Sequence, residues 1–149
     1  DTETAVKAMS EAPASVGNSE AKSNEFKAEG NKFFRAHNYV KAIEFYSKAV
    51  DCDPKNPVFY SNRAICHIRM ENYGLAIEDA KKGIEMDKNY VKSYYRLGTA
   101  HAALGKYKEA IADFKKVLKI KKTDAQAKKK LKECQKAWRE IQFFKAIQS

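Results

Sequence analysis

The sequence repeats itself at an interval of 34 residues. Four kinds of position keep this interval through three copies: Gly30, Ala64 and Gly98; Tyr39, Tyr73 and Tyr107; Ala42, Ala76 and Ala110; Ile43, Ile77 and Ile111. A period of this length is typical of proteins built from stacked units, in which each unit buries its apolar face against its neighbours. The chain is therefore predicted to be a short array of similar units.

Within each unit the apolar residues recur at intervals of three and four, which predicts two helices separated by a short polar break. The expected units span about residues 23–56, 57–90 and 91–124. Ser23 is a candidate N-cap for the first helix, and Asn56 followed by Pro57 is a typical helix start. The small residues that recur on both helices of a unit predict close approach of the two helices, because larger side chains would separate them.

A final helix is expected over about residues 124–148, with Thr123 or Asp124 as its cap. Its apolar stripe consists of Ala127, Leu131, Cys134, Trp138 and Ile141. The last unit of an array exposes one flank, and a helix with one apolar face is suited to cover it. Nine lysines and one acid, Asp124, occur from Lys115 to Lys132, and we interpret most of that charge as a solvated face.

Residues 1–22 show no sustained helical stripe and are rich in Ala, Ser, Glu and Thr. Too little apolar surface is available there to offset the entropy of ordering, so the segment is predicted to be a disordered leader. Residues 23–149 are then expected to form one domain.

Composition excludes several classes of protein. The 149 residues have a mean hydropathy of -0.67 and 44% hydrophobic residues, and no apolar run approaches the length of a membrane span. We expect a cytoplasmic protein, with the nucleus as a second location. Cys52, Cys66 and Cys134 form no pair at metal-ligand spacing, so free thiols are expected.

This repeating pattern resembles the tetratricopeptide repeat, which has the same 34-residue period, small residues at the eighth and twentieth positions and an aromatic residue at the twenty-fourth, present here in two copies. Two departures are found. Lys88 and Lys122 occupy the thirty-second position, where the first copy has Pro54, and Ala80 replaces the aromatic residue in the second copy. The resemblance implies an all-α fold, a right-handed superhelical solenoid of three helix pairs with a long C-terminal capping helix. It also implies that the first helix of each pair lines a concave, peptide-binding side.

Cations and amides recur on these first helices at positions that lie close to one helical face: Lys27, Asn31, Asn62, Lys92 and Arg96. Three cations oppose negative charge, and two amides donate to carboxylate oxygens or to a peptide backbone. A C-terminal aspartate offers two carboxylates on one residue, so an extended acidic peptide end is the ligand that suits this chemistry.

These five residues resemble the dicarboxylate clamp of chaperone-binding tetratricopeptide domains, which recognise the terminal Met-Glu-Glu-Val-Asp of heat-shock protein 90 or the related end of heat-shock protein 70. The resemblance implies that Lys27, Asn31, Asn62 and Lys92 hold the last residue, while Arg96 and Lys92 meet an upstream group. By the same resemblance Phe34 and Ile65 form an apolar shelf, and Arg69 attracts the upstream glutamates.

Two further segments resemble the regulatory domains of the type-five serine/threonine protein phosphatase family. They are Lys92 to Arg96 and the tail from Ala127 to Ile147. That resemblance implies a domain that inhibits and targets a phosphatase domain absent from this chain. Phe143, Phe144 and Ile147 are candidates for its contact. A clamp domain of another co-chaperone is the alternative.

No constellation for catalysis is found, so this chain is not expected to be an enzyme, and neither a cofactor nor a metal is expected. His37, His67 and His101 are the only histidines, and the last two share one repeat position where a packing residue belongs. The lysine-rich C-terminal region leaves polyanion binding as a second alternative, because lysines supply phosphate contacts. Specific nucleic-acid readout is not expected, since neither an arginine cluster nor an aromatic platform accompanies them.

Overall fold

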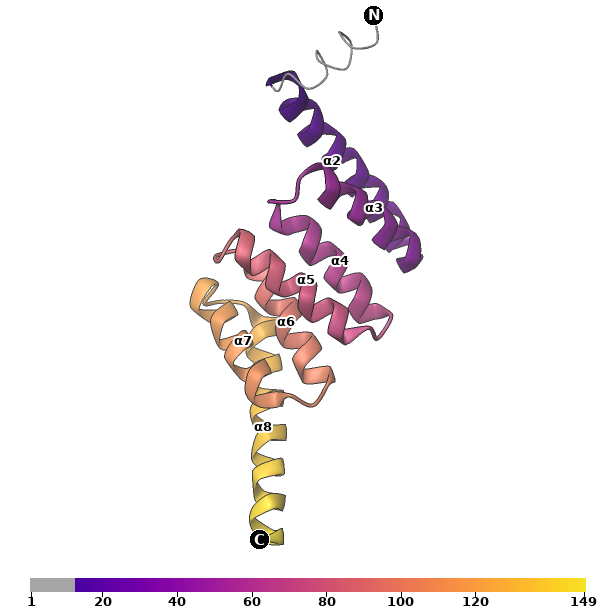
Figure 1. Ribbon diagram of the computed structural model, residues 1–149. Helices are drawn as coiled ribbons and strands as arrows, with labels where there is room; N and C mark the ends of the chain where they lie inside the picture. The colour runs from indigo at the N-terminus through magenta and orange to yellow at the C-terminus, as the bar shows by residue number, and fades with distance from the viewer. Residues whose placement is uncertain (1–12) are drawn as a thin grey trace, which may run out of the picture.

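The computed structural model describes residues 13–149, which contain seven helices and no strands. The helices are α2 (Pro13–Arg35), α3 (Tyr39–Cys52), α4 (Pro57–Arg69), α5 (Tyr73–Met86), α6 (Val91–Ala103), α7 (Tyr107–Ile120) and α8 (Ala125–Gln148). Three helix pairs stack one on the next, and α8 packs against α7 (Figure 1). The predicted solenoid of three helix pairs with a capping helix is confirmed.

Each helix pair turns in the same way. The first helix ends at a residue with positive φ, and these residues are again 34 apart: His37 (60°), Glu71 (60°) and Gly105 (74°). The next backbone amide bonds back to the first helix in each case, at 2.8 Å for Asn38 to the Phe33 carbonyl. This bond is the closing bond of a Schellman motif, which satisfies carbonyls that the helix end would otherwise leave free. The predicted turns are confirmed, although only one of the three uses glycine.

Short polar side chains cap the starts of α3, α4 and α8, whereas α5, α6 and α7 begin without a side-chain cap. The Asn56 side chain accepts a hydrogen bond from the Val58 amide, and Pro57 occupies the first helical position, as predicted. Of the two candidate caps for the final helix, Asp124 is the one that accepts, from the Ala127 amide. Such caps each stabilise a helix by about 1 kcal/mol.

The predicted start of the first helix at Ser23 is wrong. Helix α2 begins at Pro13, so the part of the expected disordered leader from residue 13 onward is helical. Ser23 is fully buried inside the helix, and its hydroxyl donates to the Glu20 carbonyl. One turn earlier, the Ser19 hydroxyl donates to the carbonyl of Cys52 at the end of α3. That hydrogen bond joins the extended part of α2 to the end of α3. The predicted disorder of residues 1–12 lies outside the described residues.

The small residues lie where the helices of a pair approach most closely. A Cβ added to Gly30 would lie 2.6 Å from the Tyr46 ring, and one added to Gly98 would lie 2.9 Å from the Phe114 ring. The second pair places Ala64 and Ala80 at the corresponding positions, both fully buried. Sequence reasoning treated Ala80 as a departure from the repeat, and the structure buries it fully at the position where the other two pairs have an aromatic ring.

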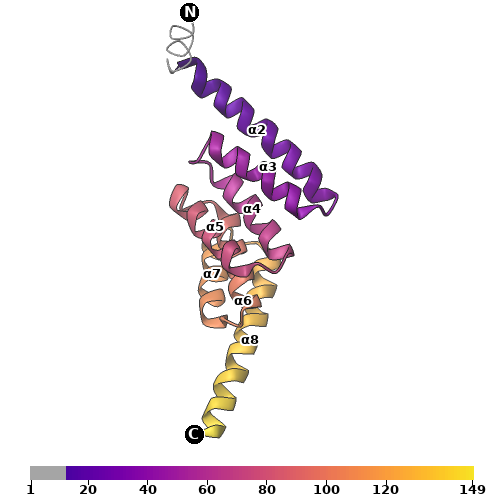
Figure 2. The same ribbon diagram turned by 45° about the vertical axis from the view of Figure 1, so that its right-hand side comes forward.

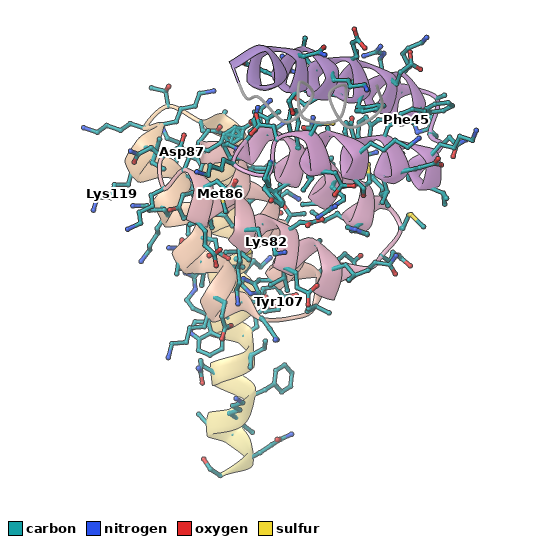
Figure 3. All side chains as sticks on the ribbon, turned by 45° about the horizontal axis from the view of Figure 1, so that its top comes forward. Phe45, Lys82, Met86, Asp87, Tyr107 and Lys119 are labelled. Atoms are coloured by element: carbon teal, nitrogen blue, oxygen red, sulfur yellow. The ribbon has the colours of Figure 1, made fainter. Side chains whose placement is uncertain are left out.

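A second set of side chains joins the helices of each pair. Phe33 stacks on Phe45 with ring centroids 5.4 Å apart, and Figure 3 labels Phe45 on α3. The two positions 34 residues further along hold His67 and Asp79, 3.6 Å apart. The third copy, His101 and Asp113, is in hydrogen-bond contact at 2.7 Å.

Asp79 also accepts two hydrogen bonds from Arg63, at 2.9 and 2.7 Å. The Arg63 Nη1 donates in addition to the Ser47 hydroxyl of the preceding pair. Arg63 therefore has its charge neutralised and its donors engaged inside the fold.

In the described part of the chain, no helix is both long and apolar enough to cross a membrane.

The close approach of α6 and α7 predicts opposite effects for two glycine substitutions. Gly98→Ala should lower the free energy of unfolding by about 1 kcal/mol, because the overpacking cost of about 1–3 kcal/mol exceeds the gain of about 0.5–1 kcal/mol from removing a helical glycine. Gly74→Ala should raise it by about 0.5 kcal/mol, since nothing lies within 4 Å of the new Cβ. Urea denaturation measures both, and equal effects at the two positions would contradict the packing argument.

Candidate functional site

The predicted clamp residues all lie on the first helix of a pair. Lys27 and Asn31 are one turn apart on α2, Asn62 is on α4, and Lys92 and Arg96 are one turn apart on α6. Helices α4 and α6 pack directly against each other. Asn31 is placed by a hydrogen bond and Lys92 and Arg96 by a shared cleft, whereas Lys27 and Asn62 are placed by their positions on the helices.

A hydrogen bond from the second helix of its own pair fixes the orientation of the Asn31 side chain. The hydroxyl of Tyr46, on α3, donates to Asn31 Oδ1, so the amide nitrogen is the end of the side chain that is left to donate elsewhere. Tyr46 is only 2% exposed, and burial raises the pKa of its hydroxyl well above the usual value. The hydroxyl therefore stays protonated, which keeps it a donor. Gly30 provides the room for the ring.

Arg96 is a largely buried cation without a carboxylate partner in the described part of the chain. Burial lowers the pKa of its guanidinium, the charge of Arg69 acts in the same direction, and Tyr90 and Tyr95 partly oppose this. Its Nε is buried and has no hydrogen-bond acceptor. Burying an uncompensated charge destabilises a fold, so Arg96 is a strong candidate for contact with an anion.

Lys92 and Arg96 share a cleft of about 190 Å³. Its other walls are formed by residues of α6, the end of α7 and the start of α8: Val91, Tyr95, Val117, Lys121, Asp124 and Gln126. Sequence reasoning missed this extension and grouped Lys121 with the solvated lysines. The position of Lys121 immediately after α7 was the available signal, because a helix end adjoins the next helix of the stack.

The predicted apolar shelf is partly assembled. Phe34, on α2, packs edge-on against Tyr39 with centroids 5.6 Å apart. Arg69, on α4, lies over the Phe34 ring at 5.7 Å. The structure thus brings Phe34 and Arg69 together, while Ile65 is half-buried on α4 with no recorded contact to them. A ligand side chain that stacked on the same face of the Phe34 ring would take the place of Arg69.

Cys66 is a core residue of the first helix of the second pair. Its side chain is fully buried on α4 and packs in the cluster that contains Tyr46, with Phe34 at the edge of that cluster. Burial raises the pKa of its thiol to about 12, and the positive charges of Arg96 and Arg69 oppose that rise. Tyr46 and Cys66 are therefore core residues and not part of the exposed groove, and the charges of Arg96 and Arg69 lie near enough to act on the thiol.

The remaining titratable clusters are structural. His67 and His101 pair with Asp79 and Asp113 between the two helices of their own pairs. Burial lowers the pKa of His67, whose Nδ1 has no partner. Among the described residues, no group of three His, Cys, Asp or Glu side chains is arranged to hold a metal ion.

Two matches to tetratricopeptide repeat family models cover residues 45–78 and 91–124. The second agrees with the predicted boundaries of the third unit. Among curated proteins, human serine/threonine-protein phosphatase 5 is 40% identical over 50 residues, which is 34% of this chain and 10% of that protein. The chain thus spans only about a tenth of the curated relatives that it matches most clearly.

Solved structures match over a larger share. The first tetratricopeptide domain of Spaghetti (RPAP3), bound to the HSP90 peptide SRMEEVD, is 34% identical with a TM-score of 0.79, and the match covers 80% of this chain and 97% of that chain. The second such domain of human RPAP3, in complex with the HSP70 peptide SGPTIEEVD, is 32% identical with a TM-score of 0.74. That match covers 80% of this chain and 98% of the RPAP3 chain.

The contrast between Arg96 and Arg63 predicts opposite effects on stability in the absence of ligand. Arg96→Met should raise the free energy of unfolding by about 1 kcal/mol, because it removes a buried cation that has no partner. Arg63→Met should lower it by about 3 kcal/mol, because Asp79 then loses the two hydrogen bonds of its buried ion pair. Thermal and urea denaturation of both variants measures this difference. A loss of stability in Arg96→Met would show that Arg96 supports the fold.

Proposed function

The chain belongs to the tetratricopeptide repeat family, and from that premise we propose that it binds the acidic C-terminal peptide of heat-shock protein 90. The residues that bind are Lys27, Asn31, Asn62, Lys92 and Arg96. A tetratricopeptide domain is a protein-interaction fold, and two related domains were solved with peptides that end in Glu-Glu-Val-Asp. Both peptides present two carboxylates on their last residue.

The observation that carries the proposal is the unpartnered, largely buried Arg96. A peptide carboxylate would supply the missing negative charge, and Lys92 lines the same cleft. Charge-assisted hydrogen bonds contribute roughly 1.5–3 kcal/mol each, so a few of them support micromolar affinity without a deep pocket.

Asn31 takes a defined role in this proposal. Because Tyr46 donates to its oxygen, its amide nitrogen donates to a carboxylate of the terminal aspartate. Lys27 and Asn62 share that residue, and Arg96 with Lys92 reaches one residue upstream. Phe34 and Ile65 receive the Met or Val side chain, and Arg69 moves from the Phe34 ring to the upstream glutamates.

The heat-shock protein 90 end is favoured over that of heat-shock protein 70 through this last step. Methionine is unbranched and adapts to a shelf that opens only when Arg69 moves, whereas the isoleucine of SGPTIEEVD is branched and stiffer. Preference for one peptide is therefore decided at Phe34, while affinity for the shared terminus is decided at Arg96.

Calorimetric titration with a peptide ending in Met-Glu-Glu-Val-Asp tests the groove. We expect a Kd of roughly micromolar order, weakened about tenfold or more by Arg96→Ala or Lys92→Ala and abolished by amidation of the peptide's C-terminus. Tyr46→Phe should weaken binding about fivefold although Tyr46 is buried, because Asn31 loses its fixed orientation.

Lys82→Ala is the matched control, since Lys82 is an exposed cation on α5, a second helix (Figure 3). It should leave the affinity within about twofold. Binding that survives amidation of the peptide would contradict the clamp and would indicate general attraction to the net charge of +10.

We further propose that this domain inhibits and targets a serine/threonine phosphatase domain that lies outside these residues. The similarity to human phosphatase 5 supports this step. Mixing this chain with the catalytic domain of that phosphatase should lower its activity on a phosphopeptide, and the Met-Glu-Glu-Val-Asp peptide should restore it. Peptide binding without any inhibition would separate the two proposals and favour a co-chaperone of another kind.

A further inference from the structure

Helix α8 carries a second pattern on the face opposite its buried stripe. Its members follow one another at intervals of three or four residues: Lys129, Lys132, Lys136, Arg139, Phe143 and Ile147. Most lie two residues from a member of the buried stripe, which places them about 200° around the helix from it. We call this set the α8 ridge. All six side chains are exposed.

The two ends of the ridge differ in chemistry. Its first four members are cations. In the described part of the chain none of the four has a carboxylate within ion-pair distance. The ion pair within α8 joins Lys130 and Glu133, neither of which belongs to the ridge. Its last two members are apolar, and Phe143 and Ile147 are each 64% exposed, as is the adjacent Phe144. Large apolar side chains grouped on a surface in this way mark interaction sites.

The ridge is accessible. The last turns of α8 extend beyond the other helices (Figures 1 and 2), and the side chains on those turns reach into open space (Figure 3). At the junction of the cationic and apolar parts, a shallow hollow of about 400 Å³ is lined by Lys136, Arg139, Glu140, Phe143 and Phe144. A hollow between ring faces and cationic stems receives an apolar side chain whose neighbours are acidic.

We propose that the α8 ridge docks an acidic amphipathic helix of a partner protein. Alternating steps of three and four residues form the seam along which two helices pack side by side. Carboxylates of the partner would face the four cations, and a large apolar residue of the partner would enter the hollow beside Phe143. This inference does not depend on the proposed function of the groove, because the ridge uses none of the groove residues.

Charge and geometry favour this occupant over two others. A second copy of the chain is disfavoured, since a parallel pairing would place lysine against lysine and an antiparallel pairing would bring no carboxylate of the ridge to its four cations. A membrane surface is disfavoured because an interfacial helix presents apolar residues along its whole length and flanks them with cations. On α8 the cations and the apolar residues follow one another along the same ridge.

The test uses a designed helical peptide of three heptads, with Glu at four successive seam positions and Leu at the next two. A second peptide carries the same pattern in reversed order, so that both parallel and antiparallel docking are sampled. A scrambled peptide of the same composition is the control. Fluorescence anisotropy should show binding of one patterned peptide at least about tenfold tighter than the scrambled one. Raising NaCl from about 50 to about 300 mM should weaken it several-fold, because the Debye length shortens.

Two double variants separate the halves of the ridge. Lys132→Glu with Lys136→Glu should weaken binding at least about tenfold, and Phe143→Ser with Ile147→Ser about fivefold. Lys81→Glu with Lys82→Glu is the control, because it changes the net charge equally on exposed residues of α5 and should change affinity less than about twofold. The helical circular dichroism spectrum and the thermal unfolding midpoint should be retained in all three, which shows that each variant is folded.

Three results would overturn the inference. Equal affinity for the patterned and scrambled peptides would show that only net charge matters. Binding to vesicles of phosphatidylserine and phosphatidylcholine that the ridge variants abolish, with no peptide binding, would assign the ridge to a membrane surface. A concentration-dependent dimer lost in Phe143→Ser with Ile147→Ser would assign it to a second copy.

Discussion

The closeness of the two helices within each pair is the constraint on which the rest of the structure depends. Gly30 and Gly98 lie against the rings of Tyr46 and Phe114 at distances that leave no room for a Cβ. A pair held this closely fixes the rotation of its first helix, and that rotation decides which residues face the groove. The contact at Gly30 also places the Tyr46 hydroxyl where it meets Asn31, so one close approach serves both packing and the site.

The middle pair satisfies the same constraint with different residues. Ala64 and Ala80 leave more room than a glycine and a ring, and the neighbouring positions hold the polar network of Arg63, His67 and Asp79. Each polar group removed from water needs a partner in such a network, and the two hydrogen bonds from Arg63 supply it for Asp79. In the third pair Leu97 occupies the position of Arg63, and His101 bonds Asp113 directly.

The sequence allowed prediction of the features that repeat. Helix boundaries after Ser23, the turns and the small-residue contacts follow from the 34-residue period, because each copy tests the others. Features that occur once were missed: the extension of α2 includes a bond from Ser19 to the Cys52 carbonyl, and the place of Lys121 in the cleft depends on how α7 meets α8. The placement of Arg69 over Phe34 likewise depends on two helix ends that no local pattern brings together.

Arg63 and Arg96 differ by one position within the repeat, and their side chains have different surroundings. They occupy adjacent positions of successive repeats, about 100° apart around the first helix. The position of Arg63 points to the second helix of its own pair, where Asp79 neutralises it. The position of Arg96 is shared with Asn62. Asp124 lines the same cleft, but among the described residues Arg96 forms no ion pair, so its charge is not neutralised inside the fold. A shift of one residue would exchange these two environments, so the strict 34-residue period decides which arginine is neutralised inside the fold.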